Sequence, residues 1–358
     1  MKTISRLTAG LLVVLAAAAQ QASRPPNVML SNDRLELTIQ GTGGTLVKLL
    51  LRDSEPLSPL ATMGHFLALD GFGAPSEPER VAGMPFHGEA SKQVAKVIAS
   101  QNSGPVHSTT FEIALPLAQE TLTRTIEMVK GENVVYVTSD LQSGLATDRP
   151  VSWAEHATLG PPFLEGGKTV VDMPALNCRV RPFKPGGIPG RLAYGRDFEW
   201  PMAPTKDGAQ ADLRLVPTDN YLDLASCQID PKRKLAFVTA LNLDKHLLFG
   251  YVFRLQDYPW LMSWMNYTGD SRAARGMEFS TQPFDVSHQE TVAMSPLFGT
   301  PTFRWLPAKA KLQTRFLMFY AKAPEGFTGV DDVVLDGGNM TIIDRSGKRL
   351  VLPASRGL

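Results

Sequence analysis

"RLELTIQ", residues 34–40, alternates apolar and polar side chains, and this alternation guides the interpretation of the rest of the chain. One face of the extended segment carries the apolar side chains and the other face the polar ones, namely Leu35, Leu37 and Ile39 against Glu36 and Thr38. A period of two residues is the pattern of a β-strand that buries one face and exposes the other. The stretch therefore predicts a strand packed against a hydrophobic core.

Strand-like runs of similar length occur along both halves of the chain. They cover residues 45–51, 108–115, 123–129, 133–141, 234–243, 247–255, 311–321, 340–344 and 349–353. The 30 glycines and 27 prolines suit many turns, and long stretches with a helical period are missing. The sequence predicts an all-β protein, a large sandwich of sheets.

The composition limits the classes of function. Hydrophobic residues make up 43% of the 358 residues, so a sizeable core is expected. Lysine and arginine (36) nearly balance aspartate and glutamate (35), and the net charge is +1. This balance argues against a nucleic-acid partner bound through bulk charge. No internal repeat or clean domain boundary appears, and we expect one domain over residues 21–358.

The N-terminus has the three-part pattern of a secretory signal peptide. Lys2 and Arg6 precede an apolar run over residues 7–19, and small residues follow. A membrane-spanning helix needs roughly 20 apolar residues, which this run does not reach and no later stretch matches. We expect residues 1–20 to be removed, and the mature protein to be periplasmic or extracellular without an integral membrane segment.

The chain has two cysteines, Cys178 and Cys227, both in strand-like surroundings. In an oxidising compartment they can form a disulfide, and two buried free thiols are an equal alternative. No cysteine and histidine residues cluster at metal-ligand spacing. We therefore expect no metal site and no cofactor.

Two long segments, 70–92 and 180–220, have the composition of loops, and loops of this length in compact domains are usually functional or disordered. We expect the first to be an ordered loop over a binding face. It contains His87, which a glycine follows. Elsewhere His156 precedes a Gly-Pro-Pro corner, and in "AARGMEFSTQPFD" Glu278 would point away from its apolar neighbours if the segment is a strand.

Three segments carry a family resemblance: "PFHGEASKQVAKV" (85–97), "SWAEHATLGPPF" (152–163) and "YPWLMSWMNYTGDSRAARGMEFSTQPFD" (258–285). Their order and spacing resemble landmarks of the galactose mutarotase-like family, of which the aldose 1-epimerases are the best-known members. The resemblance covers about residues 28–355. It implies a β-supersandwich of large antiparallel sheets with a carbohydrate cleft on a concave face.

The resemblance also implies residue roles in sugar-anomer interconversion. His156 matches the family's general acid and Glu278 its general base, and neutral pH suits both forms of a histidine. The residues expected to bind a monosaccharide or oligosaccharide are His87, Arg80, Trp153, Trp264 and Arg275.

The chain also departs from the family pattern. Glu155 stands where classical members have an asparagine, one arginine-containing loop motif is missing, and the sugar-contacting aspartate has no match, with Asp257 and Asp270 as possibilities. A non-catalytic carbohydrate-binding protein that uses the same cleft is the alternative. A lyase or hydrolase is a weaker one, because a hydrolase normally needs two carboxylates.

Overall fold

The computed structural model describes residues 25–182 and 190–358. The expected signal peptide, residues 1–20, lies outside these residues. Within them, no helix is long and apolar enough to cross a membrane.

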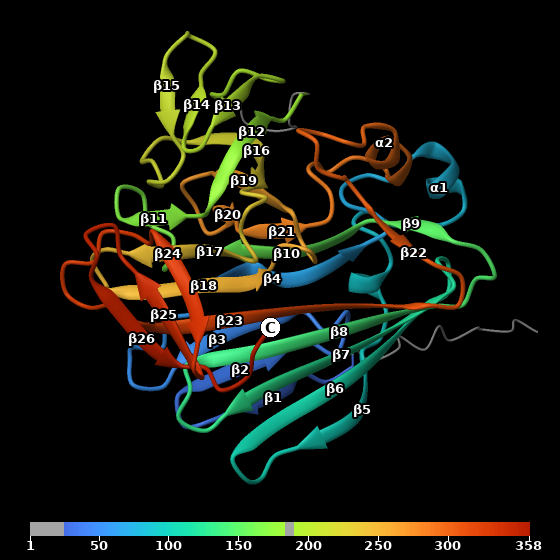
Figure 1. Cartoon of the computed structure of the whole chain (residues 1–358), viewed down its shortest axis with the longest axis horizontal. Coiled ribbons are helices and arrows are strands. Elements are labelled where there is room, and N and C mark those ends of the chain that lie inside the picture. The colour runs from blue at the N-terminus through green and yellow to red at the C-terminus, as the bar shows by residue number, and fades with distance from the viewer. Residues whose placement is uncertain (1–24, 183–189) are drawn as a thin grey trace, which may run out of the picture.

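Two large antiparallel sheets form the body of the molecule (Figure 1). The first has eleven strands, with the order β1, β2, β3, β4, β10, β20, β19, β16, β12, β13 and with β21 paired to both β10 and β19. Their bounds are Val28–Ser31, Leu35–Ile39, Leu46–Leu51, Leu60–Leu69, Trp153–Leu159, Ala274–Gly276, Trp260–Tyr267, Tyr221–Ile229, Ala175–Val180, Asp197–Glu199 and, for β21, Glu278–Ser280.

The second sheet has eight strands, in the order β11, β17, β18, β23, β8, β7, β6, β5. Their bounds are Thr169–Asp172, Leu235–Asn242, Leu247–Arg254, Lys311–Lys322, Val134–Ser143, Glu120–Val129, Val106–Leu115 and Lys96–Gln101. The all-β supersandwich predicted from the sequence is confirmed, and every strand-like run named above is a strand.

The main core lies between the two sheets. On β2, Leu35, Leu37 and Ile39 are fully buried, as the alternation predicted. They belong to one cluster with inward-facing residues of the second sheet such as Ile126 and Phe316. Fully burying a side chain of this size stabilises the fold by roughly 1.5–3 kcal/mol, so this shared core holds the sheets together.

The C-terminal segment covers the other face of the eight-stranded sheet. It forms a three-stranded meander of β24 (Asp332–Asp336), β25 (Asn339–Ile343) and β26 (Arg349–Pro353). Met340 and Ile342 pack in a second hydrophobic cluster with Phe237 and Val252 of the sheet. The residues of β8, β17, β18 and β23 that point away from the main core, such as Tyr136 and Phe319, are therefore buried as well.

Small elements complete the fold. They are the helices α1 (Glu77–Val81), η1 (Ala90–Lys92) and α2 (His288–Ala293), and the short paired strands β9 (Arg149–Val151) with β22 (Arg304–Leu306) and β14 (Met202–Pro204) with β15 (Gln210–Asp212). Cys178 of β12 and Cys227 of β16 are opposite each other in the ladder and form a disulfide. The sequence left a disulfide and two buried free thiols as alternatives, and the structure shows the disulfide.

Candidate functional site

A cavity of about 310 Å³ lies on the face of the eleven-stranded sheet that points away from the main core. Its lining comes from the central strands of the sheet and from the loops above them: Met63, Phe72, Phe86, His87, His156, Leu224, Trp264, Glu278 and Asp285. Four of the residues singled out in the sequence thus come together here: His87, His156, Trp264 and Glu278. A concave, mostly apolar site with a few polar groups is the usual form of a small-molecule site.

Strand alternation on β10 explains why His156 reaches this cavity. Trp153, Glu155 and Ala157 face the main core, so Ala154 and His156 face the opposite side. There the ring of Phe66 on β4, the residue paired with His156, stacks on the imidazole with 4.2 Å between the centroids. This packing fixes the orientation of the His156 ring.

Glu155, the residue that departs from the family pattern, belongs to a charged cluster inside the main core. Its carboxylate contacts His65 (2.8 Å) and Arg124, a residue of the opposite sheet, and accepts hydrogen bonds from Trp153 and Tyr258. Burial would raise the pKa of Glu155, but Arg124 and His65 outweigh burial and lower it to about 2. Glu155 is therefore an ionised group that links the two sheets beneath the cavity.

The short strand β21 and the nearby Gly276 determine where the carboxyl group of Glu278 lies. Its neighbours Met277 and Phe279 pack into the main core, so its own side chain points to the cavity, as expected from the sequence. A Cβ atom on Gly276 would stand 2.7 Å from Oε1 of Glu278 and 2.8 Å from the backbone nitrogen of Trp264. Only a glycine leaves room for the carboxyl group at this position.

His156 and Glu278 converge. Nε2 of His156 lies 3.6 Å from Oε1 of Glu278, and both side chains are almost completely buried. Neither oxygen of Glu278 has a hydrogen-bond partner, and neither does Nδ1 of His156. Buried polar atoms without partners are rare because they are costly, so these atoms mark a place where a ligand's polar groups can bind.

Burial determines the protonation of the pair. It lowers the pKa of His156 well below 6.5, with a smaller contribution from His87. Burial, assisted by Asp285, raises the pKa of Glu278 well above 4.5. Burial therefore favours the neutral form of both groups, an imidazole beside a protonated carboxyl group, so that the pair holds one acidic proton.

His87 lies on the ordered segment 70–92, which covers the cavity as predicted. Its backbone is left-handed (φ 65°), a conformation that non-glycine residues adopt mainly where the surrounding structure imposes it. The backbone N–H of Gly73 donates to Nδ1 of His87 at 3.0 Å. Burial lowers the pKa of His87 to about 4. The ring is therefore neutral at pH 7 and its proton is on Nε2, which makes that atom a hydrogen-bond donor.

The aspartate at the cavity is Asp285, which the sequence analysis did not select. Its Oδ2 accepts a hydrogen bond from Arg181, and its Oδ1 has no partner. Burial raises the pKa of Asp285 to about 6. The only signal in the sequence is its position seven residues after Glu278, at the end of the third matched segment.

The two aspartates considered from the sequence do not line this cavity. Asp257 is buried against Arg254 and Arg304, and Asp270 forms an ion pair with Arg272 at the surface.

Three of the expected sugar-binding residues lie elsewhere. Arg80 is exposed on α1 and forms an ion pair with Glu77. Trp153 is fully buried in the main core, where its indole N–H donates to Glu155. Arg275 is buried and donates to the hydroxyl of Tyr267. Each of these side chains already has a structural partner, and the structure does not bring any of them to the cavity lining.

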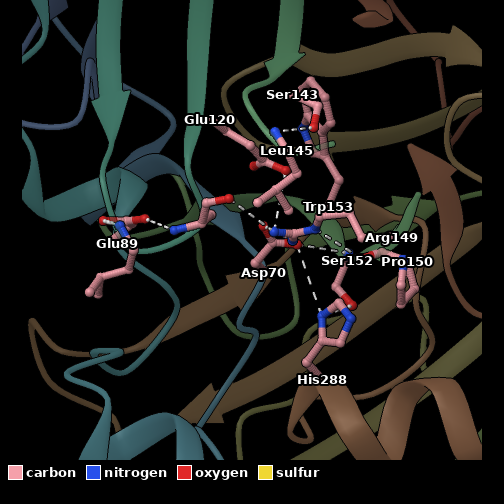
Figure 2. A network of polar contacts seen from close by, with 12 residues as sticks. Asp70, Glu89, Glu120, Ser143, Leu145, Arg149, Pro150, Ser152, Trp153 and His288 are labelled. Carbon is pink, nitrogen blue, oxygen red and sulfur yellow. Dashed lines mark hydrogen bonds and ion pairs between the residues drawn. The ribbon is translucent and has the colours of Figure 1, made fainter. Parts of the chain in front are cut away.

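A second polar cluster anchors the loop and helix beside the cavity (Figure 2). The guanidinium of Arg149 lies between the carboxyl groups of Asp70 and Glu120, and Asp70 also approaches His288 of α2. Asp70 directly follows β4 and precedes the cavity residue Phe72. Burial and Asp70 raise the pKa of Glu120 to about 9, so this carboxyl group is protonated at neutral pH.

The residues 25–182 and 190–358 contain no group of three or more histidine, cysteine, aspartate or glutamate side chains that could hold a metal ion. The side chains at the cavity supply two imidazoles, of His87 and His156, and two carboxyl groups, of Glu278 and Asp285.

Comparison with known proteins finds similarity in three-dimensional structure but not in sequence. The sequence matches no protein-family model and no curated protein. The fold is similar to the Slr1438 protein from Synechocystis sp. PCC 6803 (TM-score 0.58, 14% identity, 84% of this chain and 96% of that chain). It is also similar to a galactose mutarotase related enzyme from Lactobacillus acidophilus (0.58, 10%, 84% and 99%).

A third similar structure is a galactose mutarotase-like protein from Lactobacillus casei ATCC 334 (TM-score 0.57, 15% identity, 83% of this chain and 100% of that chain). Each of the three is matched over nearly its whole length, although the sequences have little in common. The chain therefore has the galactose mutarotase-like fold, in a strongly diverged sequence.

Proposed function

We propose that this chain is an exported enzyme of the aldose 1-epimerase type, which interconverts the anomers of a sugar and uses His156 and Glu278 for proton transfer. The observation that carries the proposal is the 3.6 Å approach of these two buried side chains, whose free polar atoms line one cavity. The anomeric hydroxyl oxygen and the ring oxygen of an aldose are bonded to the same carbon. An acid and a base that each reach one of these oxygens can therefore lie a few ångströms apart.

The reaction needs one acidic proton on the pair. As the base removes the proton of the anomeric hydroxyl, the bond from C1 to the ring oxygen breaks, and the acid protonates that oxygen. Rotation about C1–C2 and reclosure in the reverse sense give the other anomer. The family resemblance gives ring opening to Glu278 as base and His156 as acid, so the pair's proton has to move from Glu278, where burial favours it, to His156 before the ring opens. Reclosure reverses both transfers, so each group both donates and accepts a proton during one turnover.

The other cavity residues have supporting roles in the proposal. In this proposal the Nε2–H of His87 donates to a sugar hydroxyl, and the Oδ1 of Asp285, which has no partner in the protein, accepts from one. The rings of Phe72, Phe86 and Trp264 offer apolar faces to the C–H groups of a pyranose. A glycoside hydrolase is less well supported, because Asp285, the second carboxylate, is ion-paired with Arg181.

Export is part of the proposal. Two features support it: the signal-peptide pattern of residues 1–20, and the disulfide between Cys178 and Cys227, a bond that persists in oxidising compartments.

Polarimetry of freshly dissolved α-D-glucose and α-D-galactose tests the enzymatic role. Acceleration of mutarotation above the buffer rate, in proportion to protein concentration, is the expected result. If no sugar is accelerated while calorimetry still detects sugar binding, the protein is a carbohydrate-binding protein and the enzymatic proposal is wrong.

A further inference from the structure

A second and larger cavity, of about 730 Å³, adjoins the first. Phe86 and Asp285 line both cavities, so the two are neighbours that meet at these side chains. The second cavity lies between the segment that precedes α1 and the helix α2, and its remaining lining is Ala74, Pro75, Ser76, Arg181, Val286, Ser287, Gln289, Glu290 and Ala293. None of its residues except Phe86 and Asp285 has a part in the function proposed above.

The first cavity has room for little more than one sugar ring. Ligand pockets commonly measure roughly 300–1,000 Å³, and at about 310 Å³ the first cavity lies at the lower limit of that range. It is also closed at its base by the sheet, where the proton-transfer pair is located. A ligand that extends beyond one ring therefore has the second cavity as its adjacent space.

The boundary between the cavities has the features of a sugar-binding surface. Phe86 is a large apolar side chain that is 57% exposed, and its ring contacts the imidazole of His87 at 4.1 Å between centroids. An exposed aromatic ring beside a site is a surface on which the C–H face of a sugar can pack. The unpartnered Oδ1 of Asp285 lies at the same boundary and can accept a hydrogen bond from a hydroxyl group.

The charges of the second cavity indicate a neutral ligand. Arg181 forms an ion pair with Asp285. The carboxylate of Glu290 accepts from the backbone N–H and hydroxyl of Ser287, which caps α2. Because each of these charged groups has a partner within the protein, the described lining residues favour a neutral ligand over a phosphate or a uronate. Ser76 and Gln289 add neutral polar groups to the lining.

From these features we infer that the ligand is a neutral reducing oligosaccharide of at least two units, with its reducing-end ring in the first cavity and the next ring in the second. The inference rests on the proposed function in one respect: anomer interconversion requires a free anomeric carbon at the His156–Glu278 pair. The next ring must then be joined through a non-anomeric oxygen of the reacting ring and pass Phe86 and Asp285.

The test compares glucose with lactose, maltose, cellobiose and melibiose, which all have glucose at the reducing end. Calorimetry measures binding, and polarimetry measures mutarotation of the same sugars. We expect at least one disaccharide to bind about tenfold more tightly than glucose, equivalent to about 1.4 kcal/mol. Binding of all four disaccharides no tighter than that of glucose overturns the inference.

Two variants test whether the preference for disaccharides arises in the second cavity. Ala293→Trp places a large side chain in the second cavity, and we expect the disaccharide-to-glucose ratio of affinities to fall toward one. Thr218→Trp, in a separate cavity lined by Pro161 and Tyr267, is the matched control and should keep the wild-type ratio. An unchanged ratio in a folded Ala293→Trp protein would also overturn the inference.

The two proposals fail in different ways. If disaccharides bind preferentially but no sugar is accelerated, binding of an oligosaccharide across both cavities holds, while the enzymatic proposal and the reducing-end placement that rests on it fail. If glucose and the disaccharides are accelerated with equal kcat/KM and bind equally, the enzymatic proposal holds and the inference fails.

Discussion

His156 and Glu278 approach to 3.6 Å although 122 residues separate them in the sequence, because β10 and β21 are adjacent strands of one sheet. The two side chains lie on the same face of the sheet. On the opposite face, the residues next to them along each strand are buried in the main core. The pair is therefore held by strand pairing and packing, which is the rigid support that precise proton transfer requires.

Removal of either group should strongly reduce catalysis and leave the fold intact. We expect Glu278→Gln and His156→Ala to lower kcat for mutarotation by about 10²–10⁴-fold, the usual contribution of general acid–base catalysis. Polarimetry measures the rates, and Glu112→Gln, at an exposed position of β6, is the matched control. Wild-type rates in both site variants would show that the pair is not the proton-transfer machinery.

The titration of His156 should not limit the rate near pH 6.5. The competent form holds one proton on the pair, and burial moves the pKa of His156 well below 6.5 and that of Glu278 well above 4.5. Activity is lost at acid pH, when His156 gains a proton, and at alkaline pH, when Glu278 loses one. Asp285, whose pKa burial raises to about 6, titrates in the same range, so the pH profile of kcat from 5 to 9 is measured on Asp285→Asn beside wild type. A half-maximal rate at pH 6.5 in this variant would contradict the burial argument.

Gly276→Ala should damage the site through the position of Glu278. The added Cβ would stand 2.7 Å from Oε1 of Glu278, so the carboxyl group or the strand has to move. A displacement on the order of 1 Å can lower kcat by up to about 10²-fold. Gly357→Ala, where the Cβ meets no atom within 4 Å, is the control. Unchanged kcat in Gly276→Ala would mean that the carboxyl position is not critical.

Glu120→Gln should stabilise the protein increasingly as the pH rises. The folded state keeps the proton of Glu120 up to about pH 9, whereas the unfolded chain loses it above pH 4.5. In that interval the folded state binds more protons, so this group lowers the free energy of unfolding with rising pH, by at most about 1.4 kcal/mol per unit. Glutamine cannot ionise and removes this dependence.

Urea unfolding of wild type and Glu120→Gln at pH 5, 7 and 8.5 measures the effect. The difference in the free energy of unfolding should grow in favour of the variant across the series. A constant difference would indicate that Glu120 is ionised in the folded protein.

Loss of the disulfide should destabilise the fold without removing the site. Cys178 and Cys227 are 49 residues apart, and a cross-link over such a loop contributes roughly 2–4 kcal/mol. We expect the Cys178→Ala/Cys227→Ala double variant to unfold at lower urea concentration by about this amount. Wild type in reducing agent should behave like the variant. Equal stability of oxidised wild type and variant would contradict the expectation.

The strands could be predicted from the sequence because their signal is local. The alternation at 34–40 specifies both the strand and its buried face, and the structure confirms both. The same local signal indicated that Glu278 points away from Met277 and Phe279. Family-like segments added His156 and His87, and the cavity contains both.

The remaining parts of the site depend on pairing between distant segments, which no local pattern shows. Trp153 and His156 lie in the same matched segment but at an odd spacing on a strand, so they face opposite sides of the sheet. Asp285 reaches the cavity only because the loop after β21 folds back over it. Phe66 meets His156 through the pairing of β4 with β10, and nothing in its own sequence context indicates this role.

The His156–Glu278 pair lies on the sheet, below loops that carry Phe72, Phe86 and Asp285. Substitutions above the pair and substitutions beneath it therefore have different consequences in evolution. Substitutions in the loops alter the shape above the pair and leave strand pairing and the charged core cluster untouched. Substitutions beneath the pair affect the stability of the whole sandwich. Selection for a new ligand would therefore act mainly on residues 71–87 and 285–293, and these segments should vary fastest among descendants of this chain.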